Sequence, residues 1–165
     1  MRAKKKFNNT NMTQSIKLTT DQIRLISLFQ NVTKTTARDC IDDEQQNKII
    51  FVVNSGKMGL AIGKGGSNIK SLQNILKRNV ELVEYFDDPV KFLKNILNPK
   101  LVNEVKLDTK QDGSSHVTVI VDQGKKGLVV GREGRNAEKA RLFAKRYFNI
   151  SNVVINSPAV TQLEM

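Results

Sequence analysis

The chain has 165 residues and a formal net charge of +11, which suits one or two compact domains that meet a polyanion or an anionic surface. Its single cysteine excludes a disulfide framework and a cluster of thiolate ligands, and it fits a cytoplasmic protein. No apolar run reaches the roughly 18 residues of a membrane span. We therefore expect no membrane partner.

Residues 1–18 are basic, rich in asparagine and without hydrophobic periodicity, so we expect a flexible arm there. Translation from Met12 is an alternative that would shorten this arm. Thr19 and Gln22 then have the spacing of a capping box, and apolar residues at helical spacing predict a helix up to about Val32.

Two strands are predicted next, near residues 36–41 and over 48–53. The second strand is apolar on both faces, so we expect helices to cover it. The pattern after it predicts a short helix within 56–62, a glycine step, a longer helix over 67–77 and a strand over 80–85.

Residues 85–105 predict a helical linker. Asp88 can cap a helix whose first turn contains Pro89, and Pro99 ends the pattern. The apolar stripe between the two prolines leads us to expect that this helix docks one half of the chain onto the other.

The second half repeats the first. Its pattern predicts strands over 101–107 and 117–121, helices over 125–130 and 135–148, and a closing strand over 150–155. Residues 49–78 align without a gap with residues 117–146, so the chain contains a duplication. Units of this size are marginally stable alone, so we expect the two to pack together. The ten positions identical to their partners 68 residues later are Val53, Gly56, Lys57, Gly59, Leu60, Gly63, Gly66, Asn68, Lys77 and Arg78.

The excess of positive charge lies entirely on the repeated segments. Residues 56–78 contribute +5 and residues 124–148 contribute +6, which together equal the net charge of +11. In both segments a glycine loop precedes a predicted helix, whose N-terminus offers unpaired amide donors and partial positive charge. The expected ligand is therefore an anion.

The glycine loops do not match the common nucleotide-binding motifs. A P-loop has four residues between its glycines, whereas Gly59 and Gly63 enclose three. Asn68 stands where the dinucleotide fingerprint requires its third glycine. The sequence also lacks a Ser-His-Asp set, an HExxH pair and a metal-ligand pattern. We therefore expect a protein that is not an enzyme, with no metal, cofactor or small-molecule substrate.

The loops at residues 63–66 (GKGG) and 131–134 (GREG) resemble the GxxG loop of KH domains, which clamps about four nucleotides of an RNA backbone. Because strands precede the loop, the resemblance implies the type II arrangement. The expected fold is α+β, with two tandem type II KH domains, each a small three-stranded sheet covered by helices. The partner it implies is single-stranded RNA.

Specific residues follow from this resemblance. Ile62 and Val130 are expected to line an apolar groove for bases, and Glu133 either repels phosphate or pairs with Arg135, which makes the first loop the stronger clamp. The residues implied to contact RNA are Lys57, Ile62, Gly63, Lys64, Gly65, Gly66, Asn68, Lys70, Lys126, Val130, Gly131, Arg132, Gly134, Arg135 and Asn136.

Residues 88–99 look like the DP-x-x-F-[IL]-x-N-x-L-x-P segment that joins the tandem KH domains of NusA transcription factors. Given the short length, the chain is similar to archaeal NusA-like proteins over residues 19–165. The resemblance implies a role in transcription termination or elongation control. It also implies a first KH domain with its linker helix over 19–98 and a second KH domain over 99–165.

RNA polymerase is a less direct implication of this resemblance. Bacterial NusA carries a polymerase-binding domain and an OB-type barrel, and neither fits the present length. Two alternatives remain open at this point. One is a ribosome-associated or rRNA-maturation KH protein, and the other is a polymerase-docking protein whose RNA sites are vestigial.

Overall fold

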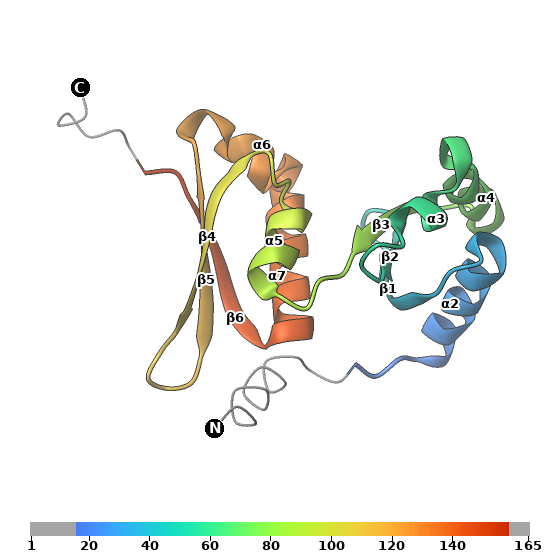
Figure 1. Cartoon of the computed structure of the whole chain (residues 1–165), viewed down its shortest axis with the longest axis horizontal. Coiled ribbons are helices and arrows are strands. Elements are labelled where there is room, and N and C mark those ends of the chain that lie inside the picture. The colour runs from blue at the N-terminus through green and yellow to red at the C-terminus, as the bar shows by residue number, and fades with distance from the viewer. Residues whose placement is uncertain (1–15, 159–165) are drawn as a thin grey trace. The chain divides into compact units, whose positions relative to one another are not determined.

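The computed structural model describes residues 16–158, so most of the expected N-terminal arm lies outside the described residues. The chain divides into two compact units, one of residues 17–86 and one that contains residues 87–158 (Figure 1). Each is α+β. Within the described residues no helix combines the length and apolar character needed to cross a membrane.

The first unit begins with a capped helix. As predicted, Thr19 Oγ1 accepts from the Gln22 amide at 3.2 Å and Gln22 Oε1 accepts from the Thr19 amide at 2.9 Å. Strand β2 is antiparallel to β1 and parallel to β3, which gives the sheet order β1-β2-β3. The elements in chain order are α2 (Thr20–Thr33), β1 (Ala37–Asp43), β2 (Lys48–Val53), α3 (Met58–Ile62), α4 (Ser67–Leu76) and β3 (Asn79–Glu84).

The core of the first unit lies between one face of this sheet and the helices. Alternate residues of β2 share it with Phe29 of α2 and Leu72 of α4, which are fully buried. The rings of Phe29 and Phe51 lie 4.7 Å apart. Burial of the whole run from Ile49 to Val53 agrees with the prediction of a strand that is apolar on both faces. This core holds α3 and α4, and therefore the glycine loop between them, against the sheet.

The second unit repeats this topology. Strand β5 is antiparallel to β4 and parallel to β6, and helix α7 packs on one face of the sheet. The apolar spacing of α7 predicts a packing face of Ala137, Ala140, Ala144 and Tyr147, and these residues are buried. Phe143 and Phe148 extend this face. The elements are α5 (Pro89–Ile96), β4 (Val102–Thr109), β5 (Ser115–Val121), α6 (Lys126–Val130), α7 (Arg135–Phe148) and β6 (Ile150–Asn156).

Helix α5 belongs to the second unit, which differs from the predicted boundary between residues 98 and 99. Asp88 caps it as expected, because its Oδ1 accepts from the Val90 amide at 3.0 Å. The Phe92 ring lies 5.6 to 5.8 Å from three rings of α7. Adding 68 to the first residue of α2 gives 88, so α5 takes the place in its unit that α2 takes in the other.

The linker stripe has a partner within its own unit. Phe92, Leu93 and Leu97 are buried, and Phe92 packs within the second unit on α7. Because the second unit's own core accounts for this packing, the stripe gives no argument for contact between the units. Rigid packing of the two units stays a prediction, which NMR relaxation of the two halves would test.

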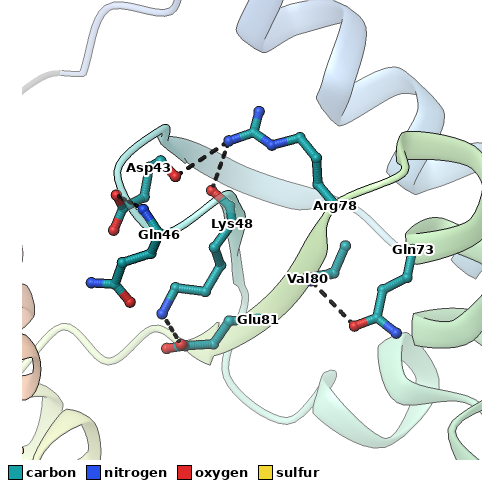
Figure 2. Close-up of polar contacts among 7 residues, drawn as sticks. All are labelled: Asp43, Gln46, Lys48, Gln73, Arg78, Val80 and Glu81. Carbon is teal, nitrogen blue, oxygen red and sulfur yellow. Dashed lines mark hydrogen bonds and ion pairs between the residues drawn. The ribbon is translucent and has the colours of Figure 1, made fainter. Parts of the chain in front are cut away.

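One cation of the basic excess has a structural role in the first unit (Figure 2). The Arg78 guanidinium pairs with the Asp42 carboxylate and donates to the carbonyls of Asp43 and Lys48 at 3.3 Å. The hydrogen bond that Arg78 donates to the Asp42 carboxylate raises the pKa of Arg78. Lys48 Nζ in turn lies 2.9 Å from Glu81 Oε1. The end of α4 is thereby fastened to the β1–β2 turn.

We expect Arg78→Ala to lower the free energy of unfolding by about 1–3 kcal/mol, because a charged donor to three acceptors is lost. Lys70→Ala is the matched control, since Lys70 is an exposed cation on the preceding helix, and its change should stay within about 0.5 kcal/mol. Urea unfolding followed by circular dichroism measures both. Equal losses in the two variants would contradict the structural role of Arg78.

Candidate nucleic-acid interface

The first glycine loop joins α3 to α4 in a tight turn. Gly63 ends α3 with φ 77° and ψ 167°, a backbone conformation that is essentially restricted to glycine. Gly65 and Gly66 follow in the left-handed region, with φ 63° and 76°. The Gly66 amide donates to the Gly63 carbonyl at 3.1 Å, and α4 begins at the next residue. The turn leaves the start of α4 directly behind the loop.

The second loop has the same shape. Gly131 has φ 83° and ψ 168°, Gly134 has φ 74°, and the Gly134 amide donates to the Gly131 carbonyl at 3.1 Å. Glu133 adopts φ 58° and ψ 24°, which matches Gly65 of the first loop. A side chain fits at this third position because a Cβ on Gly65 would meet no atom within 4 Å.

Three cations around the first loop are free to meet a ligand. Lys57, Lys64 and Lys70 are exposed, and in the part of the chain that the structure describes none of them takes part in an ion pair. Residues 56–78 contain no acidic residue. The first loop therefore combines bare backbone with positive charge that no carboxylate of its own segment offsets.

The charge of the second loop is partly neutralised. Glu133 Oε2 lies 3.4 Å from Arg135 Nη2, which is the pairing that the sequence left open. Lys125, the repeat partner of Lys57, lies 3.5 Å from Asp122. Among residues 16–158, Arg132 and Lys126 are exposed and make no ion pair. The second loop keeps fewer unpaired cations than the first.

The apolar residues beside the loops differ in exposure. Ile62 and Val130, the expected groove residues, are half-buried. Leu60 and Leu128 are instead 61% and 66% exposed, at equivalent places in α3 and α6. The prediction missed these leucines, although they form one of the identical pairs of the repeat. An apolar side chain held in solvent next to cations can contact a base or another apolar group of a ligand.

Asn68 and Asn136, which the resemblance placed among the RNA contacts, lie against their own loops. Asn68 Nδ2 donates to the Leu60 carbonyl at 3.0 Å. A Cβ on Gly63 would come within 2.8 Å of Asn68 Cγ, and one on Gly131 within 2.8 Å of Asn136 Cγ. The two amides thus occupy the space beside the first glycine of each loop.

The sheet topology and the two glycine loops define a protein with tandem KH domains, and residues 23–106 match the KH domain family. Proteins called probable transcription termination protein NusA are similar to it. The one from Halobacterium salinarum is 34% identical over 84% of this chain and 97% of its own length. The one from Methanocaldococcus jannaschii is 31% identical over 85% of this chain and 75% of its own length.

A solved structure titled "Crystal structure of APE1850" is 36% identical and has a TM-score of 0.76, over 84% of this chain and all of that one. The chain belongs to the family of archaeal NusA-like proteins.

Proposed function

We propose that this chain binds single-stranded RNA at its two GxxG loops and takes part in transcription termination or elongation control. The observation that carries the proposal is the pairing of bare glycine backbone with unpaired, exposed cations at the first loop. The same backbone is repeated at the second loop. The names of the relatives support the link to transcription.

A phosphate would lie against the loop at Gly65 and Gly66, where no side chain keeps it from the backbone. Lys64 supplies charge beside it, and the start of α4 supplies amide donors and the positive end of a helix dipole. Lys57 and Lys70 would meet neighbouring phosphates. Leu60 is exposed near the same loop and would meet a base.

This mode of binding favours single strands with modest sequence preference. Backbone contacts carry no base information, and an aliphatic side chain reads few base edges. The bases of a duplex are stacked and turned inward, so they are unavailable to an apolar contact of this kind. RNA is accordingly the partner we assign to this surface.

We expect affinity for single-stranded RNA to fall on the order of 300-fold between about 50 and 200 mM salt, if the two loops neutralise ~6 phosphates and each contributes about 0.7 log units per tenfold change in salt. Fluorescence anisotropy with a labelled oligonucleotide measures the slope. A blunt RNA duplex of the same sequence is the control and should bind more weakly. Equal affinity for the duplex would contradict the assignment to these loops.

The role in transcription has its own test. Crosslinking in cells should recover nascent transcripts rather than ribosomal RNA precursors, and recovery of precursors alone would favour rRNA maturation. RNA polymerase is the second partner we propose. A column that carries immobilised, purified polymerase should retain the protein. Retention by polymerase together with no RNA affinity in isolation would favour a docking protein instead.

A further inference from the structure

The side chain of Asn68 connects the two helices on either side of the first loop. Asn68 belongs to the first turn of α4, whereas its hydrogen-bond acceptor, the Leu60 carbonyl, belongs to α3. The bond is 3.0 Å long and spans the whole GxxG turn. It therefore fixes how α3 and α4 are oriented at the point where the loop joins them.

The same side chain explains a glycine. A Cβ on Gly63 would come within 2.8 Å of both Asn68 Cγ and Asn68 Nδ2. Gly131 and Asn136 repeat this relation, with 2.8 Å to Cγ and 2.9 Å to Nδ2. In each unit the asparagine fills the space that a side chain on the first glycine would need, so the two residues form one packed pair.

We propose that Asn68 and Asn136 are positioning residues that hold each GxxG loop in the shape that receives a phosphate, and that they act without touching RNA. The inference deepens the proposed function and rests on it. The Asn68 amide donates to a carbonyl of its own protein and packs against its own loop, and the Asn136 amide packs against its loop in the same way, so both are already engaged. Removing the asparagine side chain would therefore change the loop in the RNA-free protein.

Two amides report on the loop in the free protein. The Gly63 amide donates to the Gly59 carbonyl at 3.1 Å, and the Gly66 amide donates to the Gly63 carbonyl at 3.1 Å. Both should be protected from hydrogen exchange while the turn is closed. Loosening of the turn would expose them without unfolding the unit.

The test compares Asn68→Leu with Asn74→Leu. Leucine keeps the number and branching of the side-chain heavy atoms of asparagine at position 68 but cannot donate to the Leu60 carbonyl, whereas Asn74 is exposed on the same helix. In RNA-free Asn68→Leu the Gly63 and Gly66 amides should exchange about fivefold faster. RNA affinity should fall severalfold, because α3 and α4 no longer hold the closed turn in the geometry that a phosphate requires. The slope of affinity against salt should stay at the wild-type value, because no cation is removed. Asn74→Leu should change none of these quantities.

Two outcomes would overturn the proposal. Unchanged exchange with lower affinity would make Asn68 a direct RNA contact. Faster exchange with unchanged affinity would leave it a purely structural residue. If Asn68→Leu fails to fold, Asn68→Ala removes the donor without added bulk and carries the same expectations. If the wild type binds no RNA, the proposed function fails, while faster exchange would still support Asn68 as the residue that holds the loop.

Discussion

The variant Lys64→Asp with Gly65→Asp is expected to lose RNA affinity on the order of 100-fold. Three units of charge change within about 4 Å of a phosphate, and each is worth about 1 kcal/mol in water. The fold should survive, because both residues are exposed and a Cβ on Gly65 meets nothing within 4 Å. Aspartate also tolerates the left-handed backbone that position 65 adopts. Anisotropy measures the affinity, and circular dichroism checks the fold.

The matched variant changes the second loop at Arg132 and Glu133 to aspartate. It should lose a smaller part of the affinity, because Glu133 already places a carboxylate there and pairs with Arg135. Three units of charge change in the first loop, against two in the second. If neither variant loses affinity while both stay folded, RNA is not held at these loops.

Gly63→Ala is expected to destabilise the first unit by about 3 kcal/mol or more. The backbone at φ 77° and ψ 167° is strained by about 1–3 kcal/mol for any residue other than glycine. The new methyl group would also overlap Asn68 and Ser67 at 2.8 Å, which adds about 1–3 kcal/mol of overpacking. Urea unfolding monitored by NMR resonances of the first unit measures the loss.

Gly65→Ala is the control for this glycine. Its left-handed backbone costs alanine roughly 1–2 kcal/mol, and nothing obstructs the methyl group. Gly131→Ala should repeat the larger loss in the second unit, where the backbone and the neighbouring asparagine are the same. Equal losses at positions 63 and 65 would refute the account of the packed pair.

Most helices and strands could be predicted, because glycine positions and hydrophobic periodicity determine local structure. The strand over Lys48–Val53 and the helix over Arg135–Phe148 begin and end at the predicted residues. The capping box at Thr19, the cap at Asp88 and the packing face of α7 follow from the same local patterns. The position of α5 could not be predicted in this way, because an apolar stripe indicates that a helix is buried but not which element covers it. Applying the 68-residue offset of the repeat to α2 would have shown that α5 is its counterpart and therefore packs within the second unit.

The chemistry of the site was predictable from residue types, whereas the contacts among its side chains were not. Spacing identified both loops, but the exposure of Leu60 and the contact between Asn68 and the Leu60 carbonyl depend on how two helices meet. Lys126 was chosen from the sequence, although the repeat partner of Lys57 is Lys125. Arg78 was counted with the surface charge, and its partners come from a strand turn more than 30 residues earlier.

The third position of each loop, Gly65 or Glu133, allows the RNA affinities of the two loops to be set independently. The backbone there accepts glycine in one unit and glutamate in the other without a change of shape. On the proposed function, the unit with glutamate releases RNA first, while the other keeps the strand attached. The retained strand stays at high local concentration and can be recaptured. One chain can thus combine rapid release of RNA from one unit with slow dissociation of RNA from the whole protein. The residue at this one position sets the ratio of the two rates.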